Sequence, residues 1–342
     1  DVTSTARASA DTELSQTPVS INQNLNAYYT LNERNIFAVE SQFLYQENDP
    51  LFNSESEDQP FAVLPTDASQ DLFNIFQFKN NNTKKFDFKL DYYYVINNRS
   101  NLNLAFGTTY LDQYYRSFIE QELDSGDRLS FDQTDLQNTV DYTFKDVFVG
   151  AYYNMVKGIV TIRPGFTAHR YIAKDRQIGT TNEVKETVVL PSVYARLQFK
   201  SSESLRFNYN MSTEFVDIGS RSLGFVLQDY NRLFGGNRDL NFATYNRFSL
   251  TYFKFSMFSF TNIVARLSYD KKTDAIKNQV SLLNNGVDQV SSPINSEFVD
   301  ESFTGFVRYG RTFKKLKFNA SVNINQSMYT NLVNGRPNTA EN

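Results

Sequence analysis

The sequence contains no cysteine, no tryptophan and only one histidine among its 342 residues. Without cysteine, the chain forms no disulfide and no thiolate metal site. A single histidine, His169, gives little support for a histidine-based metal centre or a hydrolytic triad, because both need several convergent groups. A formal net charge of −4 provides no basic surface for nucleic acid. We therefore expect no enzyme, no cofactor, no metal and no nucleic-acid partner.

Long apolar runs are also missing. No stretch approaches ~18 uninterrupted apolar residues, the length of a helical membrane span, and the mean hydropathy is −0.47. These features exclude a transmembrane helix. They do not exclude a transmembrane β-barrel, because the polar residues that face its lumen lower the average hydropathy.

The sequence does contain a strict alternation of apolar and polar residues. The run 86–92 reads Phe-Asp-Phe-Lys-Leu-Asp-Tyr, and about a dozen segments repeat this pattern, which is typical of β-strands with one apolar and one polar face. The alternating segments are about 9–11 residues long or longer, enough to cross a bilayer at a tilt. The 31 Phe and 21 Tyr suit the lipid-facing surface and interfacial girdles of a membrane barrel.

The alternation predicts twelve strands. They cover 24–32, 35–47, 84–97, 102–115, 142–157, 159–172, 187–199, 204–213, 241–254, 260–270, 302–313 and 315–328. Short joins alternate with long connections, which are 48–83, 116–141, 173–186, 214–240 and 271–301, with 72–78 counted inside the first. This sorting is typical of an outer-membrane barrel with tight periplasmic turns and long outer loops. We therefore predict an all-β fold, a transmembrane up-and-down antiparallel β-barrel with about twelve strands in this chain.

The phase of the strands assigns a set of polar residues to the lumen. They are Asp87, Lys89, Asp91, Arg163, His169, Arg196, Arg206, Arg247, Arg266, Arg308 and Lys317. Two interpretations of the set stay open: it forms a selectivity field or ligand path, or its charges pair against a domain that fills the lumen. In the long loops the aromatic residues Phe61, Tyr230 and Phe234 are candidates for ligand contact.

Three segments carry a resemblance to a known family. They are 24–32 (Asn-Leu-Asn-Ala-Tyr-Tyr-Thr-Leu-Asn), 90–98 (Leu-Asp-Tyr-Tyr-Tyr-Val-Ile-Asn-Asn) and 236–240 (Gly-Asn-Arg-Asp-Leu). In this order they resemble the β-barrel of TonB-dependent receptors of Bacteroidetes, of the flavobacterial type with a carboxypeptidase-like regulatory domain. The third is similar to a Gly-Asn-Pro-Asp/Glu-Leu segment of such barrels, with Arg238 in place of proline. The resemblance covers most of 24–330.

The resemblance implies an outer-membrane transporter or receptor that takes up a scarce ligand with energy from the TonB complex. Such proteins have an N-terminal plug, a TonB-contacting box and about 22 strands, so this chain would be part of the barrel without the plug. Its implied partners are outer-membrane lipid, the plug domain, the TonB complex and an unidentified ligand. We assign 1–23 to a leading segment, loop or partial strand, 24–330 to barrel strands and loops, and 331–342 to the start of a further loop or a truncated end.

Two other functions explain parts of the pattern. A complete, passive outer-membrane channel of about twelve strands would have the same polar lumen and sorted loops. A secreted or surface-bound β-rich binding protein would pack its apolar faces on each other and bind glycan or protein through its long loops. Steady conductance without a partner would favour the channel, and purification without detergent would favour the binding protein.

Overall fold

The computed structural model describes residues 10–59, 61, 63–283 and 288–341. Strands dominate this part of the chain. Its helical elements are one turn of α-helix, α1 (Ile218–Arg221), and one turn of 3₁₀-helix, η1 (Thr134–Leu136). None of its helices has the length and apolar character needed to cross a membrane.

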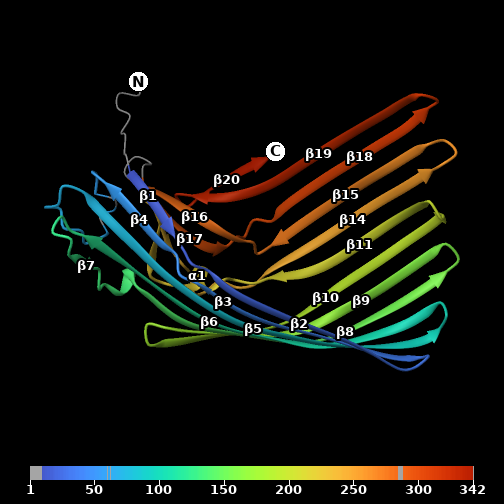
Figure 1. Cartoon of the computed structure of the whole chain (residues 1–342), viewed down its shortest axis with the longest axis horizontal. Helices are drawn as coiled ribbons and strands as arrows, with labels where there is room; N and C mark the ends of the chain where they lie inside the picture. The colour runs from blue at the N-terminus through green and yellow to red at the C-terminus, as the bar shows by residue number, and fades with distance from the viewer. Residues whose placement is uncertain (1–9, 60, 62, 284–287, 342) are drawn as a thin grey trace.

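Twelve long strands form the wall of a curved sheet (Figure 1). They are β2 (Val19–Asn32), β3 (Asn35–Asn48), β5 (Phe73–Asn97), β6 (Ser100–Glu122), β8 (Asn138–Lys157), β9 (Val160–Gln177), β10 (Thr180–Lys200), β11 (Glu203–Glu214), β14 (Ala243–Ser256), β15 (Thr261–Thr273), β18 (Asp300–Phe313) and β19 (Leu316–Val333). Each strand pairs antiparallel with the next in this order. The all-β up-and-down fold is confirmed. Each predicted segment lies wholly or largely within one of these strands, several of which are longer than predicted, and the structure contains further strands.

Six short turns lie at one end of the wall, and the other joins of the wall strands lie at the opposite end, where all are long connections except the turn between β9 and β10 (Figure 1). We call these the short-turn end and the long-connection end. The short turns join β2 to β3, β5 to β6, β8 to β9, β10 to β11, β14 to β15 and β18 to β19. This is the sorting that the sequence predicts for an outer-membrane barrel.

The two faces of the wall differ in polarity. Directly opposite residues of an antiparallel ladder share a face, so the register follows one face across all twelve strands. We call the face that contains Lys89 the inner face and the other the outer face. Most exposed large hydrophobic side chains of the wall lie on the outer face, for example Phe106, Val149 and Val322. The outer face is therefore the lipid-facing surface of the fold.

Two predicted loop segments are strands. All of the segment 72–78 except Leu72 belongs to the first part of β5. There β4 (Leu51–Ser56) pairs with one side of it and β6 with the other. The segment 173–186 is a hairpin in which β9 and β10 continue to a turn at Ile178 and Gly179, with φ of 51° and 68°. A two-residue turn with positive φ at both positions matches the twist of the strands, so the ladder continues to the tip.

Strand structure also extends beyond both predicted limits of the barrel segment. Before residue 24, β1 (Ala10–Ser15) pairs with β4 and β2 begins at Val19. After residue 330, β19 continues to Val333 and pairs with β20 (Arg336–Glu341). A short strand, β7 (Arg128–Ser130), pairs with the end of β6.

Two long connections fold into hairpins that join to each other. The connection after β11 contains β12 (Phe225–Asp229) and β13 (Arg232–Gly235), and the connection after β15 contains β16 (Ile276–Leu283) and β17 (Asp288–Asn295). β13 pairs in parallel with β17, and β16 pairs in parallel with the end of β19. We call these four strands the strap.

Buried apolar clusters hold the long connections against the inner face. Leu227 and Leu233 of the strap pack with Ile75 of β5 and Ile119 of β6. A second cluster joins Phe242 and Ile218 to aromatic residues of β6, β8 and β9, among them Tyr115, Tyr142, Phe144 and Tyr171. The core of the molecule therefore lies at the long-connection end, inside the curve of the wall.

Candidate functional site

The register places all the predicted lumen residues on the inner face. Asp87, Lys89 and Asp91 alternate along β5, and the ladders carry the same face to β9, β10, β11, β14, β15, β18 and β19. The other members on this face are Arg163, His169, Arg196, Arg206, Arg247, Arg266, Arg308 and Lys317. Their shared face follows from the period of two, whereas their partners depend on which strands are neighbours.

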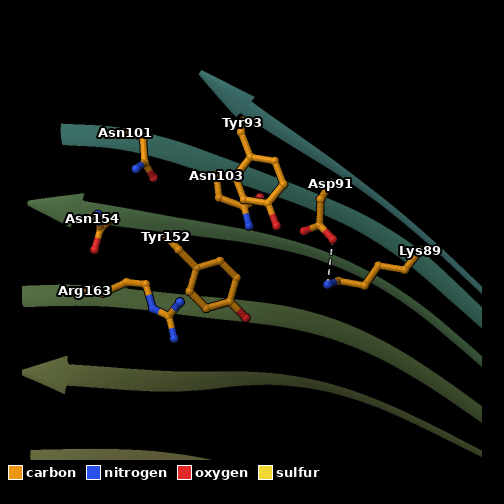
Figure 2. Close-up of a pocket in the computed structure, with 8 residues that line it drawn as sticks. All are labelled: Lys89, Asp91, Tyr93, Asn101, Asn103, Tyr152, Asn154 and Arg163. Carbon is orange, nitrogen blue, oxygen red and sulfur yellow. Dashed lines mark ion pairs between the residues drawn. The ribbon is translucent and has the colours of Figure 1, made fainter. Parts of the chain in front are cut away.

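Part of this set lines a hollow near the short-turn end. The hollow has a volume of about 500 Å³. Figure 2 shows side chains from four neighbouring strands around it: Lys89, Asp91 and Tyr93 of β5, Asn101 and Asn103 of β6, Tyr152 and Asn154 of β8, and Arg163 of β9. Amides, phenols and charged groups meet here, so the hollow presents both hydrogen-bond donors and acceptors.

The acidic member of the hollow is almost fully buried. Asp91 is 1% exposed, and its Oδ2 lies 2.7 Å from Lys89 Nζ. Its Oδ1 and the Oδ1 of Asn103 are buried and have no hydrogen-bond partner among the described residues. A buried acceptor without a partner costs free energy. The wall of the hollow therefore contains two buried acceptors that have no donor among the described residues.

Tyr152 closes one side of the hollow because the facing strand has a glycine. A Cβ on Gly165 would lie 2.1 Å from Tyr152 Cδ1. Only glycine leaves room for the ring to lie flat on the neighbouring strand at this point. Arg163, two residues earlier on the same face, has its guanidinium 5.6 Å from the ring centre of Tyr194.

His169 belongs to a hydrogen-bonded group farther along the inner face. Its Nδ1 lies 2.9 Å from Asp146 Oδ2, and its Nε2 lies 3.0 Å from Thr167 Oγ1. The ring also stacks on Phe148 at 4.9 Å. A hydroxyl, an imidazole and a carboxylate in line are the parts of a hydrolytic triad, but the local backbone N–H groups belong to a β-ladder and are not free to stabilise an oxyanion. The arrangement fits a satisfied polar wall.

The remaining lumen residues differ in their partners. Arg247 Nε lies 2.6 Å from Asp270 Oδ1 on the adjacent strand. Asp87 pairs with Lys85 at 2.8 Å, within the same strand. Arg206, Arg266, Arg308 and Lys317 form no ion pair in the described structure.

A second polar site, which the sequence did not reveal, lies at the long-connection end. Asp175 is 1% exposed and accepts a hydrogen bond from Arg238 Nε at 2.7 Å. Arg221, also 1% exposed, approaches the same carboxylate at 3.9 Å and donates to the carbonyl oxygens of Arg238 and Leu240. Arg238 is the residue that stands in place of proline in the family-like segment. Here its side chain ties the connection after β11 to β9.

Three buried side-chain amides of the wall hold the backbone of the same connection. Gln77 of β5 accepts from Leu227 N at 2.8 Å, Asn138 of β8 accepts from Gly224 N at 2.7 Å, and Gln177 of β9 accepts from Leu223 N at 3.2 Å. These contacts join residues 46 to 150 positions apart in the chain. No local sequence signal marks them.

Two of the loop aromatics are corrected by the structure. Phe61 is 2% exposed and belongs to the cluster under the strap, and Phe234 is 9% exposed. Both rings are used in packing and are not presented to a ligand, because the loops fold inward and bury their apolar side chains. Tyr230, at the tip of the β12–β13 hairpin, is half-buried.

The wall, its lipid-facing outer face and its polar inner face define the class of fold, a transmembrane β-barrel wall of the bacterial outer-membrane type. Solved structures share this architecture. No protein-family model and no curated protein sequence matches the chain.

The similar solved structures are transport and receptor barrels. The RagAB peptide transporter matches with a TM-score of 0.57 and 14% identity, over 95% of this chain and 38% of its own. The copper transporter OprC matches with a TM-score of 0.53 and 11% identity, over 92% of this chain and 53% of its own. The ferric yersiniabactin uptake receptor FyuA from Yersinia pestis matches with a TM-score of 0.54 and 10% identity, over 91% of this chain and 43% of its own. The chain therefore spans about half or less of the length of these proteins, and the likeness is one of fold.

Proposed function

We propose that this chain is part of the barrel of an outer-membrane transporter or receptor that takes up a scarce ligand with TonB-derived energy. The observation that carries the proposal is the match of more than nine-tenths of the chain to barrels of uptake proteins, at 38% to 53% of their length. We propose that the protein belongs to the TonB-dependent receptors, of the Bacteroidetes type that the segments 24–32, 90–98 and 236–240 resemble. The plug domain, the TonB complex and the ligand are the proposed partners.

The edges of the wall support the view that further strands complete the barrel. In the described residues, β2 pairs with β3 and no ladder joins it to β19. A strand edge in lipid leaves backbone N–H and C=O groups without partners, at a cost of several kcal/mol for each group. We expect the native protein extracted from the outer membrane to have a mass well above the 39.4 kDa of this chain. A native mass near this value would favour the small passive channel.

The uptake test uses the full-length protein in its own cells. Three labelled probes are compared, a Cu²⁺ salt, a ferric siderophore chelate and an oligopeptide, in the parent strain and a deletion strain. We expect at least one probe to accumulate in the parent, and its uptake to fall to background in the deletion strain and after a protonophore collapses the proton gradient. Uptake that survives the protonophore would contradict the energised mechanism.

A conductance measurement separates the transporter from the passive channel. Purified full-length protein is inserted into planar bilayers without any other component. We expect no steady conductance, because a domain that fills the polar lumen blocks it. A steady ohmic conductance would contradict the proposal and support the channel.

A further inference from the structure

The outer face of β8, β9 and β10 changes from apolar to basic along the strands. Its apolar part includes the exposed side chains of Val149, Phe166 and Val189. Toward the long-connection end, the same face carries four exposed basic residues, Lys145, Arg170, Lys174 and Lys185. These four residues therefore lie at the border of the apolar, lipid-facing surface.

The four basic residues surround one apolar residue, Ile172 of β9. Lys145 and Lys185 are directly opposite Ile172 on the two neighbouring strands, with Cα atoms about 5 Å from its Cα. Arg170 and Lys174 are two residues away along β9, at about 7 Å. We call the four residues the basic ring. It spans about 10 Å across the strands and about 13 Å along β9.

The basic ring keeps an excess of positive charge. Three acidic residues of the outer face lie beside it, and each has a basic neighbour. Glu183 lies 2.9 Å from Lys185. The others, with the basic residues directly opposite them, are Asp112 with Lys84 and Asp141 with Arg176. Neighbouring like charges destabilise a sheet, so an anion bound among the ring residues would relieve their repulsion.

The basic residues of the outer face on β14, β15 and β18 stand singly, each with a different partner. Lys254 lies 3.5 Å from Glu203, and Lys271 lies 3.8 Å from Glu301. Arg311 has its guanidinium 4.2 Å from the ring centre of Phe313. The chain as a whole carries a net charge of −4. The basic ring is therefore a local feature of β8, β9 and β10 and does not follow from composition.

We propose that the basic ring binds the phosphate groups of an anionic lipid in the membrane leaflet at the long-connection end. Phosphate oxygens accept charge-assisted hydrogen bonds from lysine and arginine, and basic residues at a membrane surface attract anionic head groups. Val147, directly opposite Arg170, continues into the apolar surface. The acyl chains of the lipid cover this surface while its phosphates lie among the four cations.

The chemistry of the border favours a lipid over a free phosphate. Inorganic phosphate would neutralise the basic ring but has no apolar part to contact the adjoining surface. The excess positive charge favours a head group with two phosphates, because one phosphate leaves part of that charge without a counter-charge. The proposal depends on the lipid-facing outer face and not on TonB-driven uptake.

The test is native mass spectrometry of the purified full-length protein in a non-ionic detergent. The protein is titrated separately with diphosphoryl lipid A, phosphatidylcholine and inorganic phosphate. We expect diphosphoryl lipid A to bind, and the other two probes to bind more weakly by about tenfold or more, since one has no net charge and the other no acyl chains. Shifted gel mobility of the unheated protein verifies that each variant is folded.

The basic ring is tested with the double variant Arg170→Gln and Lys174→Gln. We expect its affinity for diphosphoryl lipid A to fall about 30-fold, from two lost charge contacts. The matched control is the double variant Lys254→Gln and Lys271→Gln, which removes the same charge elsewhere on the outer face. Its affinity should stay within about twofold of the parent, because exposed charges farther apart than a Debye length are screened.

The single variant Lys174→Gln provides the test if the double variant does not fold. Lys174 is exposed and forms no ion pair in the part of the chain that the structure describes, so its replacement disturbs the wall little. We expect the affinity for diphosphoryl lipid A to fall about fivefold.

Four results would overturn the proposal. They are an unchanged affinity in the ring variants, an equal loss in the control variant, equal binding of phosphatidylcholine, and binding of inorganic phosphate as tight as that of the lipid. The last result would assign the basic ring to free phosphate. Failure of energised uptake with lipid binding intact would overturn the proposed function alone.

Discussion

Among individual residues, Asp175 is the centre of a buried group of charged side chains. Arg238 and Arg221 both approach it, and Asp175 and Arg221 are each 1% exposed. Removing water from three charges is expensive, and their mutual attraction and hydrogen bonds offset this cost only while all partners are present. The group also connects β9 to the connection after β11, so its loss would affect more than one strand.

We expect Asp175→Asn to destabilise the folded protein by about 3–5 kcal/mol, because it leaves two arginines without a counter-charge in a buried site. The measurement is the urea dependence of unfolding in detergent, followed by gel mobility. The control is Asp270→Asn, which removes the partner of the more exposed Arg247 and should cost about 0–1 kcal/mol. Equal effects of the two substitutions would contradict the buried-network argument.

A second residue-scale prediction concerns Asp67, in the connection between β4 and β5. Hydrogen bonds from the Ser69 hydroxyl and backbone N–H hold the pKa of Asp67 below its ordinary value of 3.8. A carboxyl whose pKa is lowered by folding contributes stability above its unfolded pKa and loses it as the pH falls through the folded pKa. We therefore expect the turn at 67–69 to open below about pH 4.

Amide hydrogen exchange of this turn, followed between pH 6 and pH 3 and corrected for intrinsic rates, is the measurement. Asp67→Asn retains a side-chain acceptor that does not titrate, so its protection should vary less with pH. Identical pH dependence in the two proteins would contradict the role of the carboxylate.

At the level of single strands, each strand of the wall has one face toward lipid and one face toward a polar interior. Adjacent residues therefore have opposite environments, and a one-residue difference decides the cost of a charge. The strand β14 shows this in its middle, where Leu250 lies on the outer face and Ser249 on the inner face.

We expect Leu250→Arg to destabilise the barrel by about 2–4 kcal/mol, because the charge enters lipid near the middle of the strand. Ser249→Arg, one position away, points into the polar interior and should cost far less. The measurement is the folded fraction in lipid vesicles as urea is increased. Similar losses for both variants would show that the faces are assigned wrongly.

One buried side chain of β5, Gln77, contributes a hydrogen bond between the strap and the wall. Gln77 is fully buried, donates to the carbonyls of Phe78 and Phe118, and accepts from Leu227 N. We expect Gln77→Leu to raise the exchange rate of amides in 225–235 about 10- to 100-fold, since an unsatisfied buried N–H costs about 1–3 kcal/mol. Gln113→Leu, which removes only a hydrogen bond to Thr83 within the wall, is the control. Unchanged exchange in 225–235 would refute this role for Gln77.

In the molecule as a whole, the strap connects parts of the wall that are far apart in the sheet. One end is fixed to β5 and β6 through Gln77 and the cluster with Ile119, and the other end pairs with β19. Seven wall strands separate β6 from β19 along the sheet. The strap therefore links wall strands that lie far apart along the sheet.

A disulfide between the two halves of the strap tests whether they must separate during uptake. Leu233 and Val290 are partners in the parallel β13–β17 pair, a spacing that fits a disulfide. We expect the double cysteine variant to lose uptake of the transported probe when oxidised and to recover it when reduced. Each single cysteine variant is a control, and full uptake by the oxidised double variant would show that the strap does not need to part.

The alternation of apolar and polar residues was enough to predict the twelve wall strands, their two faces and most of the short and long connections, because a period of two is a local property of the chain. It also placed residues such as Lys89 and Arg308 on a common face. The contacts of the long connections could not be predicted in this way and were found in the three-dimensional structure. Phe61 and Phe234 are buried, Arg238 meets Asp175, and Gln77 binds Leu227 across 150 positions. These contacts depend on how distant segments meet in space, which no local pattern specifies, and the same reason kept the hollow of Asp91 and Arg163 out of reach of the sequence.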